Sequence, residues 1–167
     1  MSIKKTFLHH FEALIDPMPM ILAPSNGPRP GTVFATIQVT PGQTLPAHQG
    51  RVDQQGVRKL FGPRVVQVQI QCYGSGSWDV LDALAMNLST QAALESSEAA
   101  NISILSVERL QSVPALMDNQ KYEDRAILDL TAHYIAAIDE DVGFIETVEG
   151  SGQVNALPPV PFSATVV

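Results

Sequence analysis

The segment CYGSGSWDV, residues 72–80, contains the residue types that could bind a phosphate. Glycines between a strand and a helix let backbone N–H groups approach an anion. A dinucleotide-binding fingerprint, however, needs a third glycine where Asp79 stands, and no lysine follows as it does in a P-loop. Because an acidic side chain in the first helical turn would repel phosphate, the pattern favours a tight turn over a nucleotide site.

The histidines and the single cysteine do not have the spacing of metal ligands. His9 and His10 are adjacent, so they point to different sides of a helix, while His48 falls in a loop and His133 in a strand. No pair has the i, i+4 spacing of a helical zinc motif, and Cys72 has no partner cysteine. We therefore expect no metal site.

Nucleophilic catalysis would require a serine or cysteine on a strained turn beside a general base. Ser75 lies in G-S-G rather than in a G-x-S-x-G elbow, and Cys72 falls on the apolar face of a strand, where a thiol is usually inert. Asp129 and His133 could form a dyad, but cross-strand ion pairs are commoner. We expect no catalytic or cofactor-binding residues and no enzymatic activity.

The charges of this 167-residue chain are unevenly distributed. Residues 1–64 contain seven Lys/Arg and three Asp/Glu (+4), whereas residues 65–167 contain three and fourteen (−11), for a net charge of −7. Proteins that grip DNA cluster basic residues, which this chain does not. No run of eighteen apolar residues occurs, so we expect no membrane span, and a lone cysteine suits a reducing cytoplasm.

The elements that would position these residues can be read from the hydrophobic pattern. An apolar stripe at three- and four-residue spacing predicts a helix over residues 3–15. Strict alternation of apolar residues with glutamines predicts a strand over Arg64–Tyr73, with Val66, Val68, Ile70 and Cys72 in a core. Thr32–Thr40 reads as another strand, and the glycine-rich region 40–62 as a long hairpin excursion.

The second half of the chain begins with a predicted helix from Ser77, its N-cap, to about Leu94. Its buried stripe would include Trp78. Further strands are predicted over Ile102–Val113 and Tyr122–Ala137, followed by a polar turn at Asp139–Asp141 and a last strand, Val142–Glu149. The sequence after it is rich in glycine and proline and ends without charge.

This order of elements predicts an α+β fold, a mostly antiparallel β-sheet with two helices packed on one face, plus the hairpin excursion and an extended C-terminal tail. We expect a single domain over residues 1–150, including the 40–62 excursion, and a tail over residues 151–167.

One set of charged residues is a candidate for contacts in an assembly. A subunit interface could use arginine–carboxylate pairs; its candidate residues are Arg51, Arg58, Lys59, Glu123, Asp124 and Arg125.

Several segments, taken in order, resemble one protein family. A P-x-P and an N-G-P-R-P turn follow the opening helix and precede TVFATIQV. Then come RVVQVQIQCYG, a helix with a tryptophan, SILSVERLQSVPALMDNQ, YEDRAILDLTAHY and a closing GFIETVEG. Over roughly residues 5–149 the chain resembles the tail terminator, or neck terminator, proteins of tailed bacteriophages.

The resemblance implies a structural virion protein, made in the host cytoplasm and located in the tail-neck region. It implies a homohexameric ring that caps the tail tube, ends its polymerisation and joins the tail to the head-side connector or adaptor, with DNA passing through the lumen. Acidic residues would suit the wall of such a lumen, and the candidates are Asp118, Asp139, Glu140 and Asp141. Partners would be the tail tube protein, the connector and, in some phages, the tail sheath. The alternatives are another head–tail connector or tail-tube-like subunit, and a small nucleotide-binding module.

Overall fold

The computed structural model describes residues 2–15, 17–117, 121–143, 147–152, 158 and 160–165. The chain divides into two units. The first comprises Met1–Pro46 and Gly62–Ala136, and the second comprises Ala47–Phe61 and Ala137–Val167. Two long strands, β4 (Val57–Tyr73) and β8 (Arg125–Asp141), contribute residues to both units.

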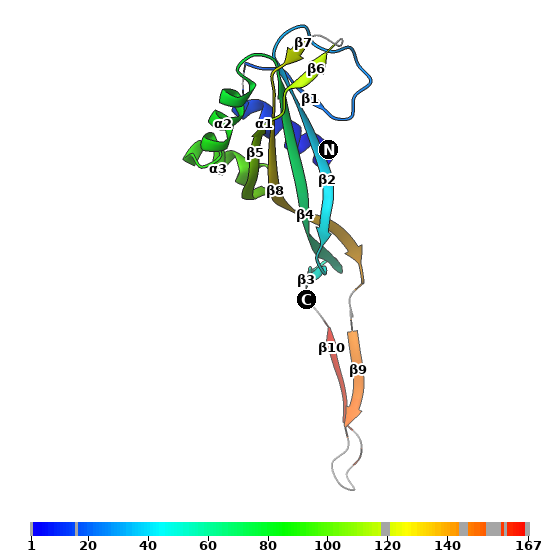
Figure 1. Ribbon diagram of the computed structural model, residues 1–167. Coiled ribbons are helices and arrows are strands. Elements are labelled where there is room, and N and C mark those ends of the chain that lie inside the picture. Colours follow the sequence, from blue (N-terminus) through cyan, green and yellow to red (C-terminus); the bar gives the residue numbers. More distant parts are fainter. Residues whose placement is uncertain are drawn as a thin grey trace. The chain divides into compact units, whose positions relative to one another are not determined.

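The first unit is built on an open sheet with the strand order β1-β2-β4-β8-β5 (Figure 1). The outer strands are β1 (Met20–Leu22), β2 (Phe34–Thr44) and β5 (Ile102–Ser112). β2 is antiparallel to β4 and β5 is antiparallel to β8, whereas the short β1 runs parallel to β2. The predicted α+β class with a mostly antiparallel sheet is therefore confirmed.

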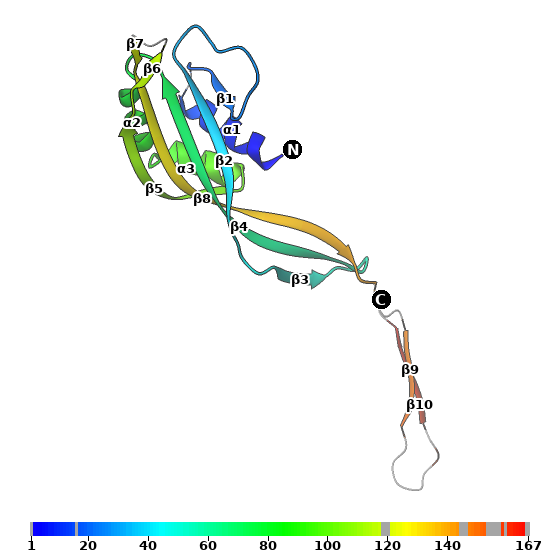
Figure 2. The same cartoon turned by 45° about the vertical axis from the view of Figure 1, so that its right-hand side comes forward.

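Three helices, rather than the predicted two, cover one face of this sheet (Figures 1 and 2). They are α1 (Ile3–Ile15), α2 (Ser77–Asn87) and α3 (Gln91–Ala99). The predicted helix to Leu94 was wrong because it is interrupted at Leu88–Thr90. Thr90 takes an extended backbone, and its side-chain oxygen accepts a hydrogen bond from Ala93 N at 3.3 Å, which starts a new helix.

The core lies between the helices and the sheet. The alternation on β4 works as predicted, since Val66, Val68, Ile70 and Cys72 are all buried. On β8 the buried set includes Ala126, Leu128, Leu130 and Ala132, and α1 adds Phe7 and Phe11. Burying this many apolar side chains supplies the main stabilisation of the unit, at about 25 cal/mol for each Å² removed from water.

Two predicted details at the start of α2 are wrong. The N-cap is Gly76, which has a left-handed backbone (φ 77°) and makes no side-chain cap, while Ser77 is the first helical residue and is buried. Trp78, expected in the buried stripe, is 43% exposed. Beginning the helix at Ser77 orients Leu81 and Leu84 to the core, and Trp78 then projects from the flank of the helix.

A small two-stranded sheet follows β5 in the chain. β6 (Ala115–Met117) is antiparallel to β7 (Lys121–Glu123). Asp118, a candidate channel residue, lies outside the described residues.

The second unit contains a β-hairpin at the predicted excursion. β3 (His48–Val52) is antiparallel to the first part of β4, with His48 opposite Phe61 and Val52 opposite Arg58. The turn is fixed by Asp53, whose Oδ1 accepts hydrogen bonds from Gln55 N and Val57 N, both at 2.9 Å. Gly56 then takes a positive φ of 78°.

The end of β8 also lies in the second unit and corrects the predicted turn at Asp139–Asp141. These residues continue β8, and Gly143, two residues beyond its end, has a φ of 66° and donates its N–H to Asp141 Oδ1 at 3.1 Å. The last predicted strand begins later, as β9 (Thr147–Gly152). In the predicted tail, Val160–Thr165 forms β10, which is antiparallel to β9.

Candidate functional site

Cys72 is placed where its thiol has little reactivity. It is fully buried on β4, and its sulfur lies 3.7 Å from Met18 Sδ. Burial raises the pKa of Cys72 to about 11, so the thiolate is scarce at neutral pH. The residue acts as a small apolar core side chain, as the sequence predicted.

The Gly74–Gly76 turn has a structural reason for both glycines. Gly74 (φ 107°) and Gly76 (φ 77°) have backbones that other L-residues rarely adopt. A Cβ on Gly74 would also approach Val33 Cγ2 to 2.9 Å. Gly74 N donates to Asp124 O at 2.9 Å, and Asp79 occupies the first turn of α2. In the turn that joins β4 to α2, the Gly74 amide is therefore already hydrogen-bonded, and the Asp79 carboxylate lies close to the start of the helix.

Apart from the neighbours His9 and His10, the histidines lie far from one another along the chain. His9 sits near Glu12 on α1, His48 is exposed on β3, and His133 is half-buried on β8 opposite Ser103. Among the described residues, no group of three or more His, Cys, Asp or Glu side chains could hold a metal ion.

His10 differs from the others because it is buried between α1 and α3. Its Nδ1 lies 3.1 Å from Ser96 Oγ and its Nε2 lies 3.2 Å from Ser97 Oγ. Burial lowers the pKa of His10, which favours the neutral ring. The sequence pattern predicted the helix correctly, but it gave no sign that His10 would be buried in the core.

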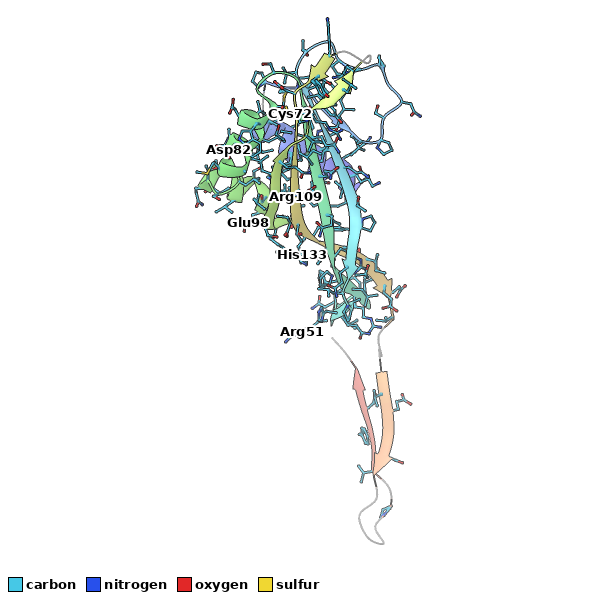
Figure 3. All side chains as sticks on the ribbon, viewed as in Figure 1. Arg51, Cys72, Asp82, Glu98, Arg109 and His133 are labelled. Carbon is cyan, nitrogen blue, oxygen red and sulfur yellow. The ribbon has the colours of Figure 1, made fainter. Side chains whose placement is uncertain are left out.

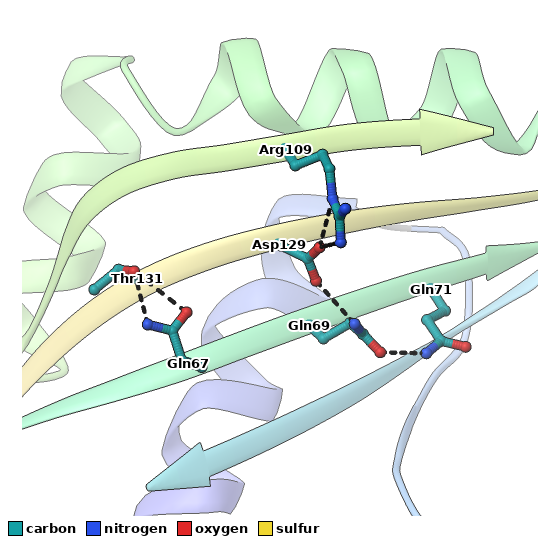
Figure 4. A network of polar contacts seen from close by, with 6 residues as sticks. All are labelled: Gln67, Gln69, Gln71, Arg109, Asp129 and Thr131. Atoms are coloured by element: carbon teal, nitrogen blue, oxygen red, sulfur yellow. Dashed lines mark hydrogen bonds and ion pairs between the residues drawn. The ribbon is translucent and has the colours of Figure 1, made fainter. Parts of the chain in front are cut away.

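The sheet face turned away from the helices carries a network of amide and hydroxyl groups. Gln67 Nε2 donates to Thr131 Oγ1 at 3.1 Å, and Gln69 Nε2 donates to Asp129 Oδ1 at 2.8 Å (Figure 4). Gln71 donates to Gln69, and Tyr73 Oη donates to Gln71 Oε1 at 2.6 Å. Gln67 thus meets residue 131 and Gln69 meets residue 129. Because the residue number rises on β4 while it falls on β8, these two strands are antiparallel.

Asp129 has a charged partner on the next strand. Arg109 Nη2 donates to Asp129 Oδ2 at 3.0 Å, so the carboxylate bridges β5 and β4 (Figure 4). This cross-strand ion pair takes the place of a dyad with His133. Alternation on β4 predicted where the glutamines point but not which partners they meet.

The predicted interface residues on β7 and β8 take part in an aromatic cluster within their own subunit. Tyr73 stacks on Phe34 with ring centroids 4.8 Å apart, and the Arg125 guanidinium lies 5.3 Å from the Tyr73 centroid. Glu123 is paired with Arg29, which the sequence reasoning missed. Within the described part of the chain, Glu123 Oε2 and Arg125 Nε are buried without a hydrogen-bond partner. Asp124 is exposed.

In the second unit, one predicted interface residue is paired with one predicted channel residue. Arg58 Nε donates to Glu140 Oε2 at 2.8 Å and Arg58 Nη1 donates to Gln49 Oε1 at 2.9 Å. Arg51, which Figure 3 labels, and Lys59 are exposed and take part in no ion pair within the described ranges.

The channel candidates on β8 do not share one face. Successive side chains of a strand point to opposite faces, so Asp139 and Asp141 lie on one face and Glu140 on the other. Asp139 and Asp141 therefore share one face of β8, whereas Glu140 lies on the opposite face and forms an ion pair with Arg58.

A groove between α3 and β5 is a surface that the sequence reasoning did not find. This α3/β5 groove has a volume of about 610 Å³, and its lining combines leucine, isoleucine and valine side chains with four serines and Glu98. Leu94 and Leu105 are 54% and 58% exposed there. The register of β5 shifts between Ile104 and Ser106, which leaves Leu105 without a partner on β8. The only sign of this groove in the sequence is the presence of apolar residues on the outer face of β5, which is an edge strand.

The described helices include none that is both long and apolar enough to cross a membrane. A comparison with curated proteins gives no match. A family model described as phage neck terminator protein matches residues 8–156. That span includes the whole sheet of the first unit, its helices after the first few residues of α1, and the β3–β4 hairpin. The chain therefore belongs to the phage neck terminator family, whose members are structural proteins of the tail neck rather than enzymes.

Proposed function

We propose that the chain assembles into a ring that caps the tail tube and ends its polymerisation. The ring would contain six subunits, as the resemblance to tail terminator proteins implies. The ring joins the tail to the head-side connector, and DNA passes through its lumen. The protein contacts are with neighbouring copies, the tube protein and the connector, with the sheath as a further partner in a contractile tail.

The observation that carries this proposal, beside family membership, is the exposed apolar surface of the β9–β10 hairpin. Val160 and Phe162 on β10 are 68% and 58% exposed. An isolated two-stranded hairpin is at best marginally stable in water and needs packing against another surface. Apolar side chains in such a place favour burial against a protein partner, which is what a subunit of an assembly provides.

The acidic residues support the proposed passage of DNA. A lumen with negative charge offers no counterion release, so DNA would not be held by it. Asp139 and Asp141 share a face and are the strongest candidates for the lumen; Asp118 and Glu140 are the others. Changing Asp139 and Asp141 to lysine should slow DNA ejection, whereas unchanged ejection rates would remove these residues from the lumen.

Electron microscopy of the purified protein mixed with tail tubes tests the main proposal. Caps restricted to tube ends, together with an end to tube growth, support a terminator. Continuous growth of new tube would instead indicate a tail-tube-like subunit, and binding to connectors alone would indicate another head–tail connector. Thermal shifts with nucleotides test the remaining alternative, and a large stabilisation lost in Gly76→Ala would favour it.

A further inference from the structure

We propose that β9 of one subunit pairs with the open edge of β5 in a neighbouring copy, so that the β9–β10 hairpin extends the neighbour's sheet. This inference rests on the proposed ring and names one of its subunit contacts. In the described part of the single chain, β9 and β5 each have one side without a neighbouring strand.

The outer side of β5 is open over a long stretch. β5 is the last strand in the order β1-β2-β4-β8-β5, so no strand of the described chain lies beyond it (Figure 2). Its eleven residues, Ile102–Ser112, include no proline or glycine, and Leu105 and Val107 are 58% and 46% exposed. Native proteins cover or block such edges, because unpaired N–H and C=O groups recruit another strand.

The other edges of this sheet are less suited to a further strand. β1 has three residues, and the part of β2 beyond its pairing with β1 contains Pro41, which has no N–H to donate. β3 has five residues and carries Arg51. Short strands, prolines and charged side chains are common protections of an edge. Two register shifts bend β5 against β8, but β5 is long and has no proline.

The β9–β10 hairpin forms a two-stranded sheet of its own. Two strands alone are at best marginally stable in water, so the hairpin needs a third strand or a packing surface. β10 contains Pro161, and prolines within sheets are confined to edge strands. β9 has no proline, so all its backbone N–H groups can donate. The free side of β9 is therefore the side that can join another sheet.

The hairpin has one apolar and one polar face. Phe162 lies opposite Gly150, where an added Cβ would come within 2.6 Å of the ring. Val148 and Val160 share this face with Phe162, and all three are exposed. The opposite face carries Glu149, Ser151 and Ser163.

The β5 edge divides in the same way. Val107 lies opposite a buried residue of β8 and lines the α3/β5 groove together with Leu94 and Leu105. Ser103 and Ser106 lie opposite residues 133 and 131 of β8, on the polar face of the sheet. An added β9 with its apolar face toward the helices brings the apolar side chains of the hairpin to the groove leucines and its serines to those of β5.

Charge has little influence on this contact. Among the described hairpin residues only Glu149 is charged, and it lies on the face that turns away from Glu98 of the groove. β5 carries one carboxylate and one guanidinium, Glu108 and Arg109. Each copy offers β9 at one place and receives at β5 in another, so the contact is head-to-tail. Head-to-tail contacts generate rings when the rotation closes.

Cysteine cross-linking between mixed full-length chains tests the pairing. Chains with Ser151→Cys, mixed with chains with Ser103→Cys or Ser106→Cys, should form disulfide-linked dimers with at least one of the two. Ser163→Cys is the matched control, because it shares the hairpin face but lies on β10. It would be two strand spacings from β5, about 10 Å, which is too far for a disulfide. The buried Cys72 will not compete.

Assembly measurements test the contact independently. Leu105→Lys places a charge at the edge and Phe162→Ser removes an apolar anchor, so each should raise the protein concentration needed for half-assembly about tenfold. Because both act on one contact, the double variant should lose clearly less than the product of the two effects. Met86→Lys, exposed on α2 outside the groove, should leave assembly unchanged. Light scattering after size-exclusion chromatography gives the readout, and thermal unfolding checks that each variant folds.

The outcomes separate this inference from the proposed function. Full assembly of the Leu105→Lys variant, links through Ser163→Cys rather than Ser151→Cys, or links only within one chain carrying both cysteines overturn the contact but leave the ring. A protein that stays monomeric at all concentrations and caps no tubes overturns both.

Discussion

Asp129 Oδ1 accepts a hydrogen bond from Gln69 at 2.8 Å while its Oδ2 accepts one from Arg109 at 3.0 Å. One carboxylate thereby links three strands, β4, β8 and β5, on the polar face of the sheet. Because β5 is an edge strand and also lines the α3/β5 groove, this bridge holds the groove wall to the centre of the sheet.

Asp129→Ala should lower the free energy of unfolding by about 1–2 kcal/mol, since it leaves Gln69 and Arg109 without their acceptor. Asp129→Asn keeps an oxygen for Gln69 and should cost less. Arg109→Ala should cost less than about 1 kcal/mol, because the arginine side chain is mostly exposed. Urea unfolding measures all three, and equal losses for Asn and Ala would assign the whole effect to the ion pair.

The burial of His10 predicts a dependence of stability on pH. Its pKa is lowered in the folded protein, so below the ordinary value of 6.5 the unfolded chain binds more protons than the folded one. The stabilisation is complete above pH 6.5 and is lost as the pH falls from there toward the folded pKa. The slope should not exceed about 1.4 kcal/mol per pH unit.

Urea unfolding at pH 7.5 and pH 5 measures this effect in the unmodified protein and in His10→Gln, which should flatten the profile. His9→Gln is the control, because His9 lies one residue away with its side chain exposed. A profile that is equally steep in His10→Gln would show that other groups are responsible.

The two glycines of the β4–α2 turn should respond differently to alanine. In Gly76→Ala the added Cβ meets no atom within 4 Å. The substitution should lower the free energy of unfolding by about 1 kcal/mol, which is the penalty of a left-handed backbone. Gly74→Ala adds a 2.9 Å approach to Val33 and should cost clearly more. Thermal unfolding compares the pair, and equal losses would contradict the role assigned to Val33.

Deleting residues 152–167 should weaken assembly while the first unit stays folded. The deletion removes β10, whose pairing partner β9 belongs to the second unit, whereas the core of Phe7, Ile70 and Leu128 belongs to the first. Far-ultraviolet circular dichroism and cooperative unfolding should persist, and tube capping should be lost. Loss of the cooperative transition itself would show that the tail is needed for the fold.

The sequence predicted those parts of the fold that depend on period-two alternation. Val66–Cys72 and Ala126–Ala132 have their apolar residues on one face, and each face is buried. Where a local signal competed with a longer pattern, the prediction was less accurate. Thr90 is a capping residue inside an apparently continuous helical stripe, and Asp139–Asp141 resembles a turn but continues a strand whose length depends on pairing with β4.

The Arg58–Glu140 pair and the α3/β5 groove were harder to predict because they depend on tertiary neighbours. Arg58 and Glu140, eighty-two residues apart, meet only when β4 and β8 are paired. The α3/β5 groove similarly depends on how α3 is placed beside β5, which no local pattern encodes. Charged residues on β3 and β4 could be named as interface candidates from the sequence, but the exposure of Leu94 and Leu105 at the groove could not be foreseen.

Part of the polar sheet face described above relies on neutral donors and acceptors. The Gln67–Thr131, Gln71–Gln69 and Tyr73–Gln71 contacts involve no net charge on either side. Ionic strength screens attractions between exposed charges, such as the Arg109–Asp129 pair, but hardly affects amide and hydroxyl bonds. Outside its host, a particle containing this subunit would thus keep these neutral contacts in fresh water and in brine alike.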